Sequence, residues 1–293
     1  MAHYYTTAGL VFRSDLPLTS LSPVLPDAEH DVSISLRALP APARMTEEKN
    51  MTRLHLHPGI STDSDGFCLD WKHHGRFRVE NGKRIFYNET AAASAYFEHF
   101  LVNEVMAGIF FQRGCFLLHA SAALLPDGTA AVFFGEPGAG KSTTLGFFVK
   151  HGCGVLTDEI VVIGFRQGVP YIQPFIPILR LWDSAARHLG YTQNNEKRKY
   201  EIPVDYTAGA VPLKAAFSLR KSERFEVRPG LTHREHLDLF GNFPLPNALL
   251  SAEEQAKRFT QAADIIRACT VFQVERTAHS FEALDQWVSR FLA

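Results

Sequence analysis

Residues 135–142 constrain this chain more than any other stretch, because they read GEPGAGKS. A glycine, four residues and then Gly-Lys-Ser is the pattern of a P-loop, which follows a strand and opens a helix. Residues 129–134 form an apolar run typical of a strand, and residues 142–150 are predicted to be helical, with Gly152 as the terminator. The sequence therefore predicts an α/β fold in which a strand runs directly into a phosphate-binding loop.

The chemistry of such a loop assigns roles to its residues. Glycines let backbone amides turn inward around phosphates, and the helix N-terminus adds positive potential. Lys141 is expected to reach the β- and γ-phosphates, and the Ser142 hydroxyl to be a Mg²⁺ ligand. The alternative is a glycine-rich turn with an exposed lysine. The residues predicted to contact the nucleotide are Gly135, Glu136, Pro137, Gly138, Ala139, Gly140, Lys141, Ser142 and Thr143.

The strand before the loop is predicted to have an antiparallel neighbour. Residues 116–125 read as another strand, and only the turn Pro126-Asp127-Gly128 separates it from residues 129–134. A turn this short joins antiparallel strands, since a parallel pair needs a long crossover. Many P-loop proteins instead enter the loop from a parallel sheet, so this arrangement is unusual.

Three further residues are candidates for metal binding or catalysis. Asp158 and Glu159 end the run GVLTDE, and an acid at the tip of a strand is where P-loop proteins keep a metal-binding carboxylate. Adjacent residues on a strand point to opposite faces, so only one acid can face the phosphates unless the strand is irregular there. The alternative is an acidic turn. His119 lies in the neighbouring strand and is either a catalytic group or a hydrogen-bonded core histidine.

The remainder of the chain suggests two domains. Residues 1–88 are predicted to be a small β-rich domain, with a hairpin turn at Asn81-Gly82, and residues 89–293 the P-loop domain. Helices are expected over residues 89–112, with Gly114 closing the helix, and over residues 281–292. Residues 194–199 read NNEKRK and are predicted to be an exposed loop that closes over phosphate or peptide as a lid.

Charge and composition limit the classes of binding partner and the location that we expect for this protein. The formal net charge is −1, without the basic excess of a nucleic-acid binder, so no nucleic acid is expected. The most apolar stretch, residues 91–111, is interrupted by Glu98, His99, Asn103 and Glu104, so no membrane span is expected. The N-terminal residues lack the pattern of a secretion signal. The four cysteines lack close spacing and are expected to be reduced, which favours a cytoplasmic protein.

The motifs LLHASAALL, GEPGAGKSTT and GVLTDEIVV resemble those of the HPr kinase/phosphorylase superfamily. His119 lies 22 positions before Lys141 and Asp158 lies 17 positions after it, similar to the family's spacings. The flanks HYYTTAGLVFRSDLPL, RFRVENGKRIFY, FQRGCFLLHAS and LRLWD are similar to the kinases that phosphorylate lasso-peptide precursors on a C-terminal serine. The resemblance implies a mixed sheet of the carboxykinase type.

The resemblance also implies site roles. Asp158 matches the general base, Glu159 the second acid that assists the metal, and His119 the histidine near the transferred phosphate. The family's Asp-Asp pair is Asp-Glu here, and its C-terminal Gly-Arg-Asn signature is missing, which argues against HPr as substrate and against phosphorolysis. Arg180 and the cluster Lys197-Arg198-Lys199 are further phosphate-binding candidates, although a charged cluster is commonly a solvated loop.

The function expected from the sequence is transfer of the γ-phosphoryl group of ATP, with Mg²⁺, to a seryl hydroxyl of a precursor peptide. Two alternatives remain: a kinase for small-molecule hydroxyls, and a non-catalytic nucleotide-binding protein of a peptide-modifying complex. The better-known kinases of the family are hexamers, so a homo-oligomer is also considered.

Overall fold

The computed structural model describes residues 2–25, 29–41, 45–47, 58–176, 178–191, 199–203, 209–230 and 233–293. The chain divides into two compact units. One comprises Met1–Leu117 and Phe243–Lys257, and the other Leu118–Asn242 and Arg258–Ala293. This division differs from the predicted boundary between residues 88 and 89. The first unit includes the helices that follow residue 88, because their aromatic side chains pack on its sheet: Trp71 stacks on Phe100 at a centroid distance of 4.4 Å.

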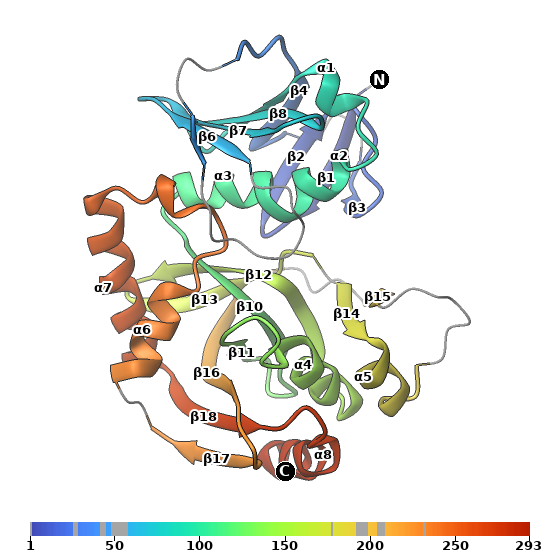
Figure 1. Ribbon diagram of the computed structural model, residues 1–293, viewed down its shortest axis with the longest axis vertical. Helices are drawn as coiled ribbons and strands as arrows, with labels where there is room; N and C mark the ends of the chain where they lie inside the picture. The colour runs from blue at the N-terminus through green and yellow to red at the C-terminus, as the bar shows by residue number, and fades with distance from the viewer. Residues whose placement is uncertain are drawn as a thin grey trace. The chain divides into compact units, whose positions relative to one another are not determined.

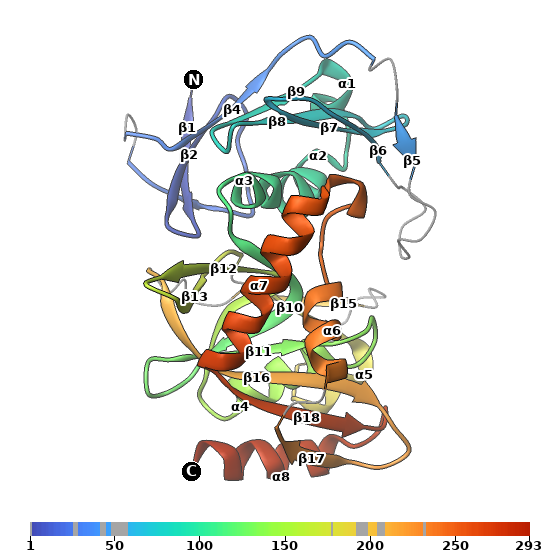
Figure 2. The same ribbon diagram turned by 90° about the vertical axis from the view of Figure 1, so that its left-hand side faces the viewer.

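The first unit is β-rich, as expected. Its described strands form a nine-stranded sheet in the order β3-β1-β2-β4-β9-β8-β7-β6-β5 (Figures 1 and 2). The predicted hairpin is β8–β9, and both turn residues have positive φ, 52° at Asn81 and 61° at Gly82. The strands are β1 (His3–Thr7), β2 (Leu10–Ser14), β3 (Ser22–Pro23), β4 (Val32–Leu36), β5 (Thr46–Glu47), β6 (Gly59–Thr62), β7 (Gly66–Trp71), β8 (Gly75–Glu80) and β9 (Arg84–Tyr87).

The continuous helix predicted over residues 89–112 is wrong. The segment consists of α1 (Glu89–Ala92), α2 (Phe97–Phe100), a π-helical turn (Leu101–Val105) and α3 (Met106–Gln112). After α1 the chain leaves the helix, and the amide of Phe97 then donates to the carbonyl of Ser94 at 3.0 Å. Periodicity of apolar residues cannot detect such a break, because both pieces bury the same kind of face. The helix does end before Gly114, whose φ is 78°, as predicted.

The second unit has a mixed sheet, and the predicted antiparallel pair is confirmed. Strand β10 (Phe116–Leu124) pairs antiparallel with β11 (Ala130–Phe134), with Ala122 opposite Val132. The described strands run in the order β11-β10-β12-β13-β16-β18-β17, and β11 also pairs with β16, which closes a ring. The pairs β11–β16 and β16–β18 are parallel. The fold class is therefore a mixed α/β, with β11 between an antiparallel and a parallel neighbour.

The remaining elements of this unit are the other strands of the sheet, the separate pair β14–β15, and the helices (Figure 1). They are α4 (Lys141–Lys150), β12 (Gly154–Arg166), β13 (Val169–Gln173), β14 (Ile178–Trp182), α5 (Asp183–His188), β15 (Lys199–Pro203), β16 (Val211–Lys221), β17 (Glu226–Pro229), α6 (His233–Gly241), β18 (Thr270–Arg276) and α8 (Phe281–Leu292). A 3₁₀ turn (Asn247–Leu249) precedes α7 (Ala252–Ala268), which continues from the first unit into the second. The predicted helix over residues 281–292 is confirmed. Residues 194–198 of the predicted lid lie outside the described residues, and Lys199 begins β15.

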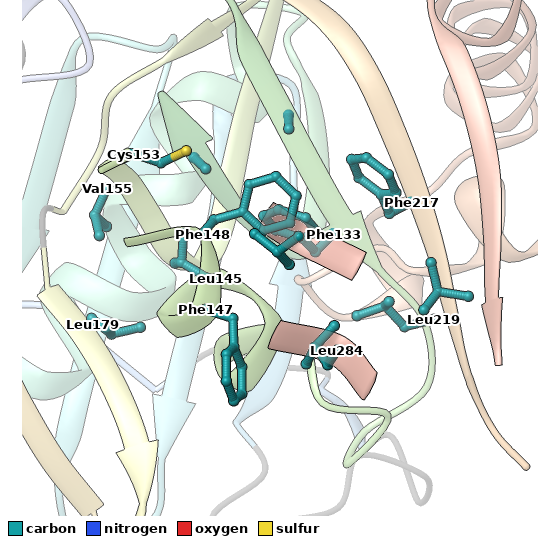
Figure 3. Close-up of a cluster of buried hydrophobic side chains, with 14 of the residues drawn as sticks. Phe133, Leu145, Phe147, Phe148, Cys153, Val155, Leu179, Phe217, Leu219 and Leu284 are labelled. Carbon is teal, nitrogen blue, oxygen red and sulfur yellow. The ribbon is translucent and has the colours of Figure 1, made fainter. Parts of the chain in front are cut away.

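Aromatic rings pack α4 and α8 against the sheet. Phe148 of α4 contacts Phe133 and Phe217 (Figure 3). Phe217 of β16 is fully buried and stacks with Phe133 of β11 at 5.3 Å and with Phe272 of β18 at 5.1 Å. The rings of Trp287 and Phe291 from α8 meet its face edge-on. These rings join the three parallel strands β11, β16 and β18, and the end of β16 lies against the glycine-rich loop.

All four cysteines are free thiols in this structure. Within the described part of the chain, no helix combines the length and apolar character needed to cross a lipid bilayer.

We expect Phe217→Ala to lower the free energy of unfolding by about 3 to 5 kcal/mol, because it removes the ring at the centre of this aromatic cluster. The matched control is Phe259→Ala on α7, where the ring is 49% exposed and the loss should be clearly smaller. Urea denaturation of both variants measures the difference, and equal losses would show that Phe217 is not central to the core.

Candidate functional site

The loop between β11 and α4 has the backbone of a tight turn. The amide of Ala139 donates to the carbonyl of Glu136 at 3.0 Å, and Gly135, Gly138 and Gly140 all have positive φ. At Gly135, where φ is 142°, a Cβ atom would lie 2.2 Å from the carbonyl oxygen of Leu219 in β16. Only glycine fits there, so the loop lies directly against the end of β16.

Lys141 is the first residue of α4, and its side chain turns back into the loop. Its Nζ donates to the carbonyl of Gly135 at 2.9 Å and lies 3.5 Å from that of Glu136, and the residue is only 8% exposed. An ammonium group beside the N-terminus of a ten-residue helix adds to the positive potential there. The loop, the lysine and the helix together are therefore suited to bind an anion such as a phosphate group.

Asp158 of β12 is the best-connected polar residue near this loop. Its Oδ1 accepts hydrogen bonds from Ser121 Oγ at 2.6 Å and from Ser142 Oγ at 2.9 Å. Its Oδ2 accepts from the backbone N–H of Arg180 at 2.9 Å. Three elements thus hold one carboxylate: β10, the start of α4, and β14. The predicted closeness of Ser142 and Asp158 is present in the structure.

The environment of Asp158 disfavours its charged form. The residue is 4% exposed, and no cationic side chain among the described residues forms an ion pair with it. Burial, together with the charge of Glu159, raises the pKa of Asp158 from 3.8 to about 6, although the three hydrogen bonds oppose that rise. A buried carboxylate without a cation is costly for the protein, and a bound cation would relieve that cost.

The residues present fit a magnesium ion bound together with phosphates. Mg²⁺ takes oxygen ligands and usually binds through one or two carboxylates, with phosphates and waters completing its shell. Ser142 Oγ and Asp158 Oδ1 are such oxygens, 2.9 Å apart. Within the described residues, no three His, Cys, Asp or Glu side chains are grouped to hold a metal by themselves. A metal here would therefore depend on a phosphate ligand for much of its coordination.

Glu159 interrupts the regular strand beside Asp158. Its φ is 118°, a conformation that residues with a side chain rarely adopt, and its side chain is half-buried. The simple alternation that places adjacent acids on opposite faces therefore does not hold at this point of β12. His119 lies against the same backbone, since its Nδ1 is 3.0 Å from the carbonyl oxygen of Glu159. A carbonyl only accepts, so Nδ1 carries the proton in this contact.

The structure thus brings together the loop residues, Asp158, Glu159 and His119, and it adds two residues. Arg180, a predicted phosphate ligand, lies at this site, where its backbone N–H donates to Asp158; its binding to phosphate stays a prediction. Ser121 was missed, although it lies two residues after His119 and a strand places such residues on one face. Arg276 was also missed, because no local pattern links the end of β18 to the loop.

Comparisons with known proteins leave the family open. No family model and no curated protein matches the chain. Among solved structures, the HPr(Ser) kinase/phosphatase from Coxiella burnetii matches 60% of this chain and 94% of that chain, with 12% sequence identity and a TM-score of 0.31. That structure bears the family name suggested by the motifs, but a TM-score this low carries no conclusion about fold or activity. The function has to be inferred from the chemistry of the site itself.

The raised pKa of Asp158 predicts a pH dependence of stability in metal-free protein. The native state holds the proton more tightly than the unfolded state, so this group's contribution falls as the pH rises through the interval from 3.8 to about 6. Asp158→Asn, which cannot titrate, is the reference. The free energy of unfolding of the wild type minus that of this variant should fall by about 2 to 3 kcal/mol between about pH 4 and about pH 7. Urea denaturation of both proteins in the presence of a chelator measures this difference.

Asp285 provides a control of opposite sign. Burial raises the pKa of Asp285, but hydrogen bonds and charge from Lys150 and His151 outweigh burial and leave the pKa lowered. The free energy of unfolding of the wild type minus that of Asp285→Asn should rise rather than fall as the pH increases. If the Asp158 difference is flat with pH, its carboxyl is not perturbed by burial.

Proposed function

We propose that this protein is an ATP- and Mg²⁺-dependent kinase that transfers the γ-phosphoryl group to a hydroxyl. One observation carries the proposal: the hydroxyl of Ser142, at the start of the helix after the glycine-rich loop, is hydrogen-bonded to the buried carboxylate of Asp158 at 2.9 Å. This is the pair of oxygen ligands with which P-loop enzymes hold their magnesium ion. A glycine-rich turn with no role in nucleotide binding does not need a buried acid.

The nucleotide half of the site consists of the loop and Lys141. The inward-facing amides and the α4 N-terminus bind the phosphates, and the Lys141 ammonium neutralises charge on the β- and γ-phosphates. Magnesium, when bound with the nucleotide, neutralises the charge that develops on the transferring phosphoryl group. The protein's own contribution is to hold these groups in fixed positions, and the burial of Lys141 at 8% exposure supports that role.

The acceptor half of the site consists of Asp158, with Glu159 and His119 beside it. In the metal-free protein, burial raises the pKa of Asp158 to about 6, and the carboxylate is still mostly ionised at neutral pH, so it is able to accept a proton. Asp158 is proposed to orient the acceptor hydroxyl and to take its proton during transfer. Ser121 and the Arg180 amide orient the carboxylate for this step.

The acceptor is proposed to be a seryl hydroxyl of a peptide. This finer assignment rests on the sequence resemblance to the kinases of lasso-peptide precursors, and the same resemblance suggests Glu159 as an assistant to the metal. Labelled ATP offered together with peptides that end in serine, and with small hydroxyl compounds, distinguishes a peptide kinase from a small-molecule kinase. Labelling of neither would favour a non-catalytic nucleotide-binding protein.

Nucleotide binding is tested by thermal unfolding. We expect Mg²⁺-ATP to raise the melting temperature of the wild type, because a ligand that binds only the native state stabilises it. Lys141→Ala should largely abolish that rise. Lys150→Ala, at the other end of the same helix and paired with Asp285, should retain it. If neither ATP, ADP nor GTP binds the wild type in calorimetry, the proposed function is wrong.

The role of Asp158 is tested by single-turnover transfer. If it accepts the proton, Asp158→Asn should keep most of the affinity for Mg²⁺-ATP and lose roughly 100- to 10,000-fold in transfer rate. If it acts chiefly as a metal ligand, the variant should bind Mg²⁺-ATP weakly and be partly rescued by excess Mg²⁺ or by Mn²⁺. Glu159→Gln is the matched comparison and should show the metal pattern. If Asp158→Asn transfers the phosphoryl group at the wild-type rate, Asp158 has no role in the mechanism.

A further inference from the structure

Arg276 is a buried cation next to the glycine-rich loop that the proposed mechanism does not use. It is the last residue of β18 and is 4% exposed. Burial lowers the pKa of its guanidinium from 12.5 to about 10, so the group remains charged at neutral pH. Arginine is seldom buried to this extent without a carboxylate partner.

The contacts of Arg276 with the described residues point at the loop and use one of its N–H donors. Its Nη1 lies 3.4 Å from the carbonyl oxygen of Gly140, which is at the limit of a hydrogen bond, and its Cζ lies 6.0 Å from the centre of the Phe281 ring. No acidic side chain of the described residues forms an ion pair with it. The guanidinium is so close to the loop that a Cβ atom on Gly140 would lie 2.3 Å from Nη1.

The sheet places Arg276 at the same edge as the loop. Strands β11, β16 and β18 are parallel neighbours, with Phe134 opposite Ser218, and Lys221 opposite Arg276. Their carboxyl ends therefore meet at one edge, where α/β sheets bind ligands. Figures 1 and 2 show these three strands side by side.

The strand order also gives a direction to the bound nucleotide. Strand β11 has β10 on one side and β16 on the other. Asp158 is hydrogen-bonded to Ser121 of β10, whereas Arg276 lies on β18, which pairs with β16. The contacts of the two residues are thus with opposite neighbours of the strand that feeds the loop. If Asp158 marks the end where the γ-phosphoryl group meets its acceptor, the nucleoside end extends toward β16 and β18.

We propose that Arg276 binds the nucleotide at its α-phosphate, on the side of the loop away from Asp158. This inference rests on the proposed function, since it assumes a nucleotide in the loop. An arginine presents a planar fork of five donors that suits phosphate oxygens, and here one donor is used weakly on Gly140. Bound phosphate also supplies the negative charge that no described side chain supplies to this guanidinium.

The test compares Arg276→Met and Arg276→Lys with the wild type by calorimetry with Mg²⁺-ADP and Mg²⁺-ATP. The methionine variant should bind both nucleotides about 10-fold or more weakly, by a similar factor, because both contain the α-phosphate. The lysine variant should show an intermediate loss. The melting temperature of the nucleotide-free methionine variant should not fall, because the substitution removes an unpaired buried charge. Arg166→Met, which removes an arginine stacked on Tyr171 of β13, should leave both affinities unchanged.

Several results would overturn the inference. Wild-type affinities in Arg276→Met would show that the guanidinium does not touch the nucleotide. A loss confined to ATP would place it at the γ-phosphate instead. Should Arg276→Met fail to fold, Arg276→Lys decides, and unchanged affinities for both nucleotides would count against the assignment. Failure of the proposed function is distinguishable, because in that case the wild type itself would bind neither nucleotide.

Discussion

The organisation of this site depends on one buried carboxylate. Asp158 is held by hydrogen bonds from Ser121 on β10, Ser142 at the start of α4, and the backbone of Arg180 on β14. These elements come from separate parts of the chain, and no described cation pairs with the acid. A buried, unpaired carboxylate lowers stability, so hydrophobic packing elsewhere has to offset its cost. The fully buried ring of Phe217, which contacts rings on β11, β18 and α8, is a main part of that packing.

Strand β11 has one antiparallel and one parallel neighbour, and each neighbour brings different residues close to the glycine-rich loop. Its antiparallel partner β10 carries His119 and Ser121 to the side of Asp158. Its parallel partner β16 ends at the same edge as the loop and approaches Gly135 so closely that no side chain fits. Because β18 is parallel to β16, its last residue, Arg276, also reaches the loop. The mixed sheet therefore brings acidic and basic groups to the two sides of a single glycine-rich turn.

Sequence reasoning found the parts of this site that depend on local chemistry. The glycine pattern, the short turn at Pro126-Asp127-Gly128 and the acid at position 158 each act through neighbouring residues, so a motif or a spacing reveals them. It failed where distant segments decide the outcome. The break between α1 and α2 has no periodic signal, and the division into units reflects packing such as Trp71 on Phe100. Arg276 lies 136 positions from Gly140, and only the strand order shows that the two meet.

The two uncompensated charges at this site have a common physical explanation. Asp158 and Arg276 are each 4% exposed, of opposite sign, and without an ionic partner among the described residues. They do not neutralise each other as an ordinary buried ion pair would, because their strands, β12 and β18, are not neighbours in the sheet. A cationic ligand beside Asp158 and an anionic ligand beside Arg276 would offset the desolvation cost of each charge. The proposed magnesium–nucleotide complex carries both kinds of charge, with the cation at one end of the phosphate chain and anionic oxygens along it. Glu159, whose φ is 118°, adjoins Asp158, so the backbone strain lies where the proposal requires a fixed geometry.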